Sequence, residues 1–334
     1  MAGHSSLLAQ EIDELEEVLN RQKKHEWTKI AAIGSMLRAR KPTHAITIAR
    51  GSSDYAALYI GLIISRLGGI SVASLTPSFA SIYHGRLEKN NSLALAVSQS
   101  GQSPDLAALL SMAKESDAFT LAILNDATSP LSKIADYSID IHAARERAVA
   151  ATKSVIASLV AGARLTAEWL EDSSLLTATN DVSSLISTIG LSQEKCDRLA
   201  SLSHCFVIGR GMTLPIVFEA ALKLKETCRI HAEAFSSAEV LHGPAALITE
   251  GFPIVAFIPD DEARASMVTT IKQLKALGAQ MIVFDNQEQR KVRHPLLAPL
   301  PMLHDFYRHV EATARLKGFD PDRPPHLSKV TLTV

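Results

Sequence analysis

Cysteine is scarce in this chain of 334 residues, which has only Cys196, Cys205 and Cys228. The number is odd, and no two of them stand at the spacing of a metal site, so neither a disulfide framework nor a zinc module is expected. Three buried thiols in a reducing, cytoplasmic compartment are the simplest interpretation. We expect no metal in this protein.

A surplus of positive charge is missing as well. Lys and Arg number 34 against 35 Asp and Glu, which gives a net charge of -1. Because phosphate backbones and anionic membranes attract a basic surplus, no nucleic acid and no membrane is expected as a partner. The longest apolar stretch, 58–75, contains Arg66 and three glycines, so it is too polar to span a bilayer. The N-terminus lacks the basic start and apolar run of a signal peptide.

Two common phosphate-binding motifs are absent. The chain has no G-x-x-x-x-G-K-[ST] run, so a nucleoside-triphosphate loop with magnesium is not expected. Gly209-x-Gly211 begins a dinucleotide fingerprint, but Leu214 stands where a third glycine is needed. The sequence therefore predicts no nucleotide cofactor.

Short apolar runs alternate with segments of helical periodicity through both halves of the chain. Such near-continuous runs are typical of parallel strands that helices cover on both faces. Arg50-Gly51 and Arg210-Gly211 each follow such a run, which indicates a duplicated α/β unit. The predicted strands cover residues 45–49, 70–73, 93–97, 119–124, 205–208, 253–258 and 280–284.

Periodicity and composition set the expected boundaries. Apolar residues at three- and four-residue spacing predict a helix over 7–40. Glu171–Ser184 is rich in Ser, Thr, Asn and Asp, as linkers are. The predicted organisation is a helical lead over 1–40, a first α/β domain over 41–170, a linker over 171–190 and a second domain over 191–334.

A serine-rich loop, Ser98-Gln99-Ser100-Gly101-Gln102-Ser103, lies between a predicted strand and a helix that begins at Pro104. Hydroxyls and the amide end of a helix favour an anion, and Ser52 and Ser53 add hydroxyls from the neighbouring loop. Without a lysine or a metal, such a loop suits the terminal phosphate of a small molecule. The alternative is an ordinary turn with Ser103 as a helix N-cap, and the loop alone does not decide between them.

Candidate acid–base groups follow the second Arg-Gly turn. Glu219, Lys223 and Glu226 share one face of a helix predicted over 215–228. A carboxylate in a cleft there could move a proton between adjacent carbons, whereas the alternative is a solvated stripe of ion pairs. His242, in the turn His242-Gly243-Pro244, is a further candidate acid or base. Lys329, near the C-terminus, cannot be told from a solvated lysine by spacing.

Several motifs in a fixed order resemble the sugar isomerase (SIS) domain family. The nearest resemblance is to the isomerase half of glucosamine-6-phosphate synthase and to stand-alone class II glucosamine-6-phosphate deaminases, and it runs from about Ile46 to the C-terminus. The matching motifs are Arg50–Ser53, Ser98–Ser103, Glu146–Lys153, Leu222–Glu226 with His231–Glu233, Glu239–Pro244 and Leu327–Thr331.

The resemblance implies a fold and an assembly. It implies an α/β fold of two SIS domains, each a doubly wound parallel sheet flanked by helices. It also implies a homodimer whose active site is shared between subunits, with a sugar phosphate as the small-molecule partner.

The resemblance also implies roles for single residues. Glu226 would move a proton between C1 and C2, and His242, supplied by the partner chain, would assist ring opening. Lys329 matches a tail lysine that can form a Schiff base with the ketose. The binding residues that it implies are Ser98, Gln99, Ser100 and Ser103 for the phosphate, Ser53 and Val149 for the sugar, and Glu219 and Lys223 in the active site.

Three departures bear on the substrate. The short lead after Met1 leaves no room for a glutaminase domain, so glutamine is not expected as a nitrogen source within the chain. Gln102 replaces an acidic residue of the synthase loop, and Arg145 and Arg147 flank Glu146 where the synthase has smaller or apolar neighbours.

The expected reaction is the conversion of glucosamine 6-phosphate and water to fructose 6-phosphate and ammonia. The alternatives are a fructosamine-6-phosphate deglycase and another sugar-phosphate aldose–ketose isomerase. A non-catalytic sugar-phosphate sensor is disfavoured, because the forty or so N-terminal residues are too short and too acidic for a DNA-binding module.

Overall fold

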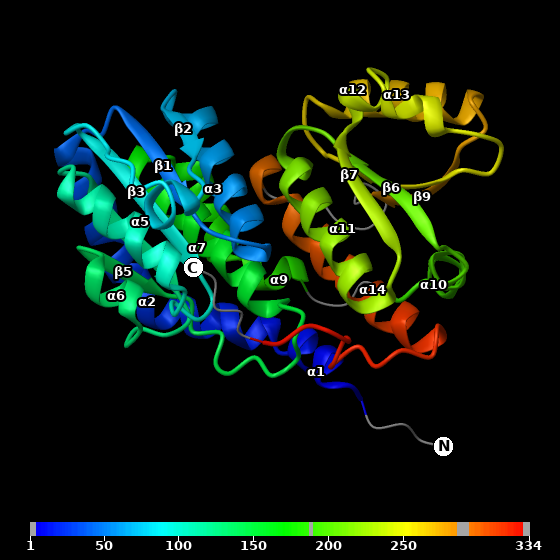
Figure 1. The fold of residues 1–334 in the computed structure, drawn as a ribbon, viewed down its shortest axis with the longest axis horizontal. Helices are drawn as coiled ribbons and strands as arrows, with labels where there is room; N and C mark the ends of the chain where they lie inside the picture. Colours follow the sequence, from blue (N-terminus) through cyan, green and yellow to red (C-terminus); the bar gives the residue numbers. More distant parts are fainter. Residues whose placement is uncertain (1–4, 187–189, 286–293, 330–334) are drawn as a thin grey trace. The chain divides into compact units, whose positions relative to one another are not determined.

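The computed structural model describes residues 5–186, 190–285 and 294–329. These fall into two compact units, which we name after their sheets (Figure 1). The five-strand unit comprises Glu14–Glu146, Lys153–Ser184 and the described residues from Ser328 on. The four-strand unit comprises the described parts of Met1–Asp13, Arg147–Thr152 and Leu185–Leu327. Each unit draws on separate stretches of chain, so the predicted lead over 1–40 contributes to both.

The first sheet has the strand order β2-β1-β3-β4-β5, and every neighbouring pair is parallel. All residues of β3 and β4 are buried, which explains why these strands stand out as apolar runs. β5 was not predicted, because it is short and only one of its residues is buried. The strands are β1 (His44–Ile48), β2 (Ser71–Ser74), β3 (Ser92–Ser98), β4 (Phe119–Leu124) and β5 (Tyr137–Asp140).

Helices cover both faces of this sheet. On one face α3 packs on α7, and α7 on α2. The approach of α3 to α7 depends on Gly162, because a Cβ there would lie 2.2 Å from Ile60 Cγ1. On the other face, α4, α5 and α6 bury Ile46, Ile48 and their neighbours. The helices are α2 (Leu15–Arg40), α3 (Ser52–Gly68), α4 (Ser78–Ser81), α5 (Pro104–Glu115), α6 (Pro130–Ile134) and α7 (Lys153–Leu170).

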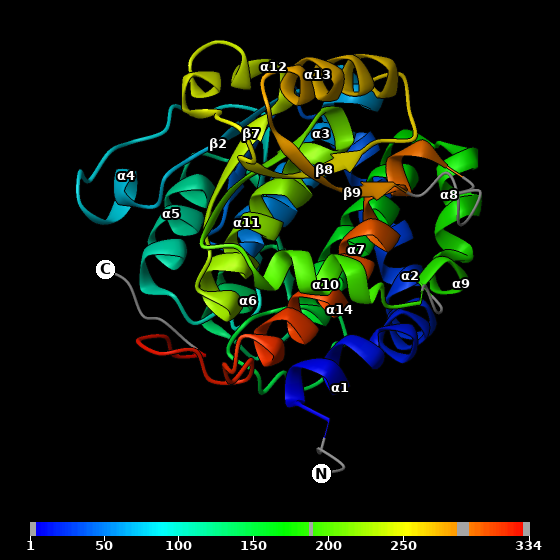
Figure 2. The same ribbon diagram turned by 90° about the vertical axis from the view of Figure 1, so that its right-hand side faces the viewer.

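The second sheet has the order β7-β6-β8-β9 and is also parallel. Figures 1 and 2 show α12 and α13 on one face of it and α11 and α14 on the other. β7, in which only Ala232 is buried, was not predicted as a strand. The strands are β6 (His204–Gly209), β7 (His231–Ser236), β8 (Pro253–Ile258) and β9 (Gln280–Asp285). The helices are α1 (Leu7–Asp13), α10 (Gln193–Ala200), α11 (Leu214–Cys228), α12 (Ser237–Val240), α13 (Arg264–Ala276) and α14 (Pro299–Leu316), with short 3-10 turns η1 (Gly211–Thr213), η2 (Pro244–Leu247) and η3 (Pro295–Leu297).

Two predicted elements need correction. The segment predicted as a single helix over 7–40 forms two helices, α1 and α2, which are separated at Glu14. The stretch interpreted as a linker carries α8 (Ser173–Asn180) and α9 (Val182–Ile186). Part of its polar composition serves helix capping, since the Asp172 carboxylate accepts from Leu175 N at 2.8 Å at the start of α8.

The expected α/β architecture, with two parallel sheets flanked by helices, is confirmed. None of the helices in the described part of the chain combines the length and the apolar composition that a membrane crossing requires.

Candidate functional site

The strand order of the first sheet reverses between β1 and β3. These strands lie side by side, with Ile48 opposite Ala96, and they lead into α3 and α5 on opposite faces. In open parallel sheets, ligands bind at such a switch point, beyond the carboxyl ends of the strands. Ser52 and Ser53 open α3, and Ser98 ends β3, so the predicted phosphate-binding residues of both loops lie at this edge.

The loop over 98–103 is held by its own serines. Ser98 Oγ accepts from Gly101 N at 3.0 Å, and Ser100 Oγ accepts from Gln102 N at 3.3 Å. Each hydroxyl oxygen is an acceptor in these bonds, which leaves its O–H available as a donor. Ser103 occupies the N-cap position of α5, yet its side chain makes no capping bond. The Ser103 hydroxyl is therefore not used as a cap, while the bonds of Ser98 and Ser100 are ones that an ordinary turn also makes.

A glycine is required at the centre of the loop. Gly101 has φ +63°, and a Cβ at this position would lie 2.2 Å from Ser129 Oγ. Both the left-handed backbone and the close approach of Ser129 exclude a larger residue without rearrangement. The loop conformation therefore requires a glycine at position 101.

An ion pair joins the loop after β1 to the first turn of α5. Arg50 donates from Nε and from a terminal nitrogen to Asp105 Oδ2, both at 2.6 Å. The Asp105 side chain is fully buried, while 45% of the Arg50 side chain is exposed. Such a two-pronged contact fixes geometry as well as charge, so the pair holds the two loops at the switch point together. Spacing alone did not point to it.

Asp54 lies beside Ser53 at the start of α3. Burial raises the pKa of its carboxyl, and the hydroxyl of Ser74 and the positive charge of Arg50 oppose this rise. Ser74 Oγ stands 3.5 Å from Asp54 Oδ1. The edge of the sheet near Ser53 therefore carries a carboxyl for which ionisation is costly.

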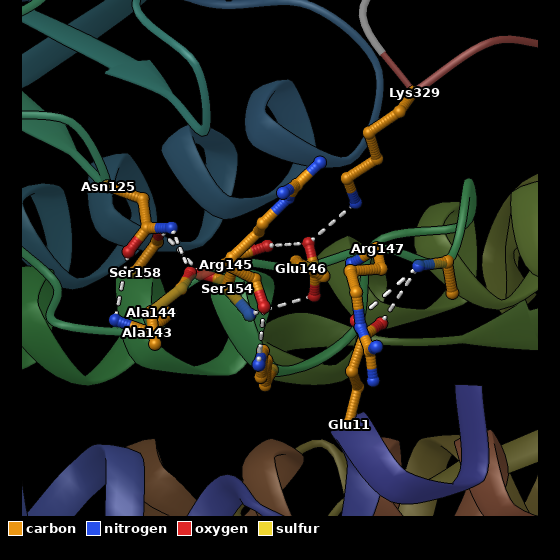
Figure 3. A network of polar contacts seen from close by, with 12 residues as sticks. Glu11, Asn125, Ala143, Ala144, Arg145, Glu146, Arg147, Ser154, Ser158 and Lys329 are labelled. Carbon is orange, nitrogen blue, oxygen red and sulfur yellow. Dashed lines mark hydrogen bonds and ion pairs between the residues drawn. The ribbon is translucent and has the colours of Figure 1, made fainter. Parts of the chain in front are cut away.

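Lys329 is held by a buried carboxylate (Figure 3). Its Nζ lies 2.9 Å from Oε2 of Glu146, which also accepts from Ser154 Oγ at 2.7 Å. Ser154 N, in the first turn of α7, is 3.3 Å from the other Glu146 oxygen. The Glu146 side chain is fully buried, and 22% of the Lys329 side chain is exposed. The tail lysine is therefore an anchored ammonium group. Glu146 lies in one of the motifs that resemble the SIS domain family, and its sequence context predicted no role for it.

The backbone around Val149 is positioned by α1 and by the chain beyond α14. Glu11 is 1% exposed and accepts from the amides of Arg147 and Ala148. Val149 N donates to Asp322 O at 3.1 Å. The Asp322 carboxylate accepts from the first amides of α1, at 2.8 and 2.9 Å. α1 is thus part of the support for a predicted sugar-lining residue.

The face of α11 that carries the predicted acid–base residues is mostly buried. Glu219 and Lys223 are each 1% exposed, whereas 20% of the Glu226 side chain is exposed. Lys223 Nζ lies 3.5 Å from Glu219 Oε1 and bonds directly to Glu226 Oε2. Tyr307 of α14 donates to the same oxygen of Glu219 at 2.8 Å. The alternative of a solvated stripe is wrong for Glu219 and Lys223.

Glu226 also borders a pocket of about 530 Å³. The α11 residues that line the pocket stand at spacings of three and four, so they form one face of the helix. Glu226 therefore contacts the buried charges and lines an open volume as well. The lining residues are Leu222, Lys225, Glu226 and Arg229 of α11 together with Pro325, His326 and Leu327.

His242 stands apart from these charges. It is exposed in the turn before η2. Within the described residues of its unit, no hydrogen bond or ion pair connects its side chain to Glu219, Lys223 or Glu226. Among residues 5–186, 190–285 and 294–329, no three His, Cys, Asp or Glu side chains converge as metal ligands would. Val330 and Thr331 of the C-terminal motif lie outside the described residues.

The SIS domain family matches residues 37–167 and 198–293 of the chain. A curated relative, the isomerizing glutamine–fructose-6-phosphate aminotransferase of Sulfurisphaera tokodaii, is 32% identical over 301 residues, which are 86% of this chain and 50% of the relative. The chain thus spans about half the length of the curated relatives it matches.

Solved structures share the fold over nearly the whole chain. A protein of Silicibacter pomeroyi, whose assignment as a phosphosugar isomerase is itself an inference, is 40% identical, with a TM-score of 0.89 over 95% of this chain and 100% of that one. The glucosamine-6-phosphate deaminase of Thermotoga maritima is 20% identical, with a TM-score of 0.78 over 98% of this chain and 100% of that one. At that identity, the likeness concerns the fold alone.

Proposed function

Because the chain belongs to the SIS domain family and the curated relatives that it matches are enzymes, we propose that it is a glucosamine-6-phosphate deaminase. The reaction converts glucosamine 6-phosphate and water to fructose 6-phosphate and ammonia. The observation that carries the proposal is the placement of Glu226, which borders a pocket and is bonded to the buried ammonium of Lys223. A carboxylate so placed suits proton transfer between adjacent carbons.

The phosphate of the substrate binds at the edge of the first sheet in this proposal. Ser98, Ser100 and Ser103 offer hydroxyls, and Gln99 offers an amide. Ser52 and Ser53 add hydroxyls from the start of α3, and Val149 lines the sugar. Support comes from the position of these serines at the switch point and from the Ser103 hydroxyl, which makes no capping bond.

The chemistry is a proton transfer followed by hydrolysis. His242 of a second copy of the chain opens the sugar ring, which exposes the C1 aldehyde. Glu226 removes the proton from C2 to give an amino enol, and the proton is returned at C1. The product is a ketimine at C2, and water attacks this carbon and releases ammonia to leave fructose 6-phosphate. Glu226 takes up one proton from C2 and gives one up at C1, so it ends the reaction in the protonation state in which it began.

Lys329 acts on the open-chain sugar. Its ammonium group, paired with Glu146, can donate a hydrogen bond to the oxygen on C1 as charge develops there when the C2 proton is removed. A Schiff base between Lys329 and the ketose would first require that ammonium group to lose a proton. The hydrogen-bond role is the one that the observed pair supports, and it gives Lys329 a place in the reaction without a covalent step.

A second function shares the same groups. A fructosamine-6-phosphate deglycase or an aldose–ketose isomerase also moves a proton between C1 and C2, so Glu226 and the serine loop serve each reaction. This alternative is supported by the names of two relatives. One is an isomerizing glutamine–fructose-6-phosphate aminotransferase, and the other is an inferred phosphosugar isomerase. The sugar that yields product distinguishes these functions.

The test is an assay of the full chain with glucosamine 6-phosphate, without glutamine or added metal. Equal amounts of ammonia and fructose 6-phosphate are expected. Glu226→Gln should lower kcat by about 10²–10⁴-fold, the usual contribution of an acid–base group. Glu194→Gln, on the exposed face of α10, is the control. Product from fructosamine 6-phosphate alone would assign the alternative, and full activity of Glu226→Gln would remove Glu226 from the base role.

A further inference from the structure

One carboxylate oxygen in the α11 cluster has a hydrogen-bond donor and an ammonium group beside it. Oε1 of Glu219 accepts from the Tyr307 hydroxyl at 2.8 Å and lies 3.5 Å from the ammonium nitrogen of Lys223. The same ammonium group bonds directly to Oε2 of Glu226. Lys223 therefore stands between two carboxylates and is much nearer to the one that borders the pocket.

The Tyr307 hydroxyl accounts for this asymmetry. Two carboxylates compete for one ammonium group, and a hydrogen bond to one of them reduces its demand for a second donor. Because the hydroxyl occupies Glu219 Oε1, the short contact of Lys223 is left for Glu226. Without the hydroxyl, Glu219 would draw Lys223 toward itself and away from Glu226.

Burial makes the arrangement sensitive to a single hydroxyl. Tyr307, Glu219 and Lys223 are each 1% exposed. In such surroundings a lost hydrogen bond is not replaced by bulk water, and charge interactions are stronger than at the surface. The hydroxyl comes from α14, which packs along α11 in the same unit, so a second helix fixes the charges on the catalytic one.

We propose that Tyr307 is a positioning residue that acts through Glu219 to hold the Lys223 ammonium group against Glu226. This inference rests on the proposed role of Glu226 as the base. Tyr307 does not contact the substrate in this account. It determines whether the buried Lys223 ammonium group lies closer to Glu219 or to Glu226, and hence the charge next to Glu226 during proton transfer.

The first test is structural and needs no substrate. In a crystal structure of Tyr307→Phe, Lys223 Nζ should move toward Glu219 Oε1, so that their distance falls below the present 3.5 Å, and its contact with Glu226 should lengthen. The ring is retained, so the packing of α14 on α11 is preserved. An unchanged position of Lys223 would overturn the proposal.

The second test follows the exchange of the C2 hydrogen of glucosamine 6-phosphate by NMR in D2O. Tyr307→Phe should lower the exchange rate constant at saturation about tenfold, a modest part of what acid–base groups contribute, with KM within about twofold of wild type. Tyr59→Phe removes the hydroxyl of another fully buried tyrosine, in the five-strand unit, and should leave the rate unchanged. Equal rates in the two variants would refute the role of Tyr307.

A double variant separates positioning from general destabilisation. If Tyr307 acts through Glu219, adding Tyr307→Phe to Glu219→Gln should change the exchange rate by less than about twofold, because coupled residues are not additive. A further tenfold loss would show that Tyr307 acts by another route. If wild-type protein exchanges no hydrogen and releases no ammonia, the proposed function fails, and the crystal structure of Tyr307→Phe still decides the positioning claim.

Discussion

The ammonium group of Lys329 and the carboxylate of Glu146 form an ion pair of 2.9 Å between residues that are 183 positions apart in the chain. Glu146 is fully buried and is also bound by Ser154. The buried carboxylate fixes the position of the Lys329 ammonium group, and part of the lysine side chain remains accessible.

Glu146→Gln should therefore impair catalysis more than it impairs folding. The amide keeps the shape of the carboxylate but loses the charge that holds Lys329, so kcat should fall at least about tenfold while KM changes little. Since Lys329 is partly exposed, water relieves much of the cost, and the free energy of unfolding should fall by only about 1–2 kcal/mol. Steady-state kinetics and urea unfolding measure the two effects. Glu171→Gln, which alters an exposed ion pair with Arg38, is the control, and an equal effect on kcat there would contradict the prediction.

The parts that the sequence predicts well are those with a local signal. β3 and β4 were identified because every residue in them is buried and apolar or small. The serine loop was identified because its hydroxyls, glycine and helix start are consecutive. β5 and β7 were missed because each has a single buried residue and mixes polar with apolar side chains, so both lack the continuous apolar run by which β3 and β4 were recognised.

The parts that the sequence does not predict are the long-range partners. Glu146 and Tyr307 look ordinary in their own segments, and their contacts reach residues 183 and 88 positions away. The spacing of Glu219, Lys223 and Glu226 predicted a shared face but not its burial. Whether such a face is solvated or buried depends on the helix that packs against it, here α14.

Gly101→Ala should lower the free energy of unfolding through backbone strain and through a steric clash. Gly69→Ala should have the backbone strain alone. Both glycines have φ +63°, but a Cβ at Gly101 meets Ser129 Oγ at 2.2 Å, whereas nothing lies within 4 Å at Gly69. Gly69→Ala should lower the free energy of unfolding by about 1 kcal/mol for the left-handed backbone alone. Gly101→Ala should lower it by roughly 2–3 kcal/mol, because the overpacked Ser129 must also move.

The same pair of variants tests the serine loop as the phosphate site. Only Gly101→Ala should raise KM for glucosamine 6-phosphate, since Gly101 shapes the loop that presents Ser98 and Ser100. Thermal unfolding and initial-rate kinetics provide the two readouts. A KM that stays at the wild-type value in a folded Gly101→Ala protein would remove the loop from phosphate binding.

Glu11→Gln tests whether α1 supports the sugar-lining segment. The Glu11 carboxylate accepts from the amides of Arg147 and Ala148, and an amide in its place would present an unwanted donor. Loss of these charge-assisted bonds should lower the free energy of unfolding by about 1.5–3 kcal/mol, and displacement of Val149 should raise KM several-fold. Glu16→Gln, on the exposed side of α2, is the control. If KM is the same in both variants, α1 has no part in substrate binding.

His304 makes stability depend on pH on the acid side of neutrality. Burial lowers its pKa below the ordinary value of 6.5, although its bond to the Ile12 carbonyl opposes the change. The folded state therefore keeps His304 neutral at pH values where the unfolded chain already binds a proton. Its contribution to stability is present above pH 6.5 and is lost as the pH falls below that value toward the folded pKa.

Replacement of this histidine removes the effect. Between pH 7.5 and pH 5, the free energy of unfolding of wild type should fall more steeply than that of His304→Gln, in which the side chain does not titrate. His326→Gln, at an exposed position, serves as the control and should follow the wild-type curve. Urea unfolding at half-unit pH steps measures the slopes. Parallel curves for wild type and His304→Gln would mean that His304 binds protons equally in the folded and unfolded states, and its pKa would then not be lowered by burial. A wild-type curve that falls less steeply than that of His304→Gln would mean that the folded protein favours the charged imidazole, with α1 anchored to α14 by a charged bond to Ile12 O.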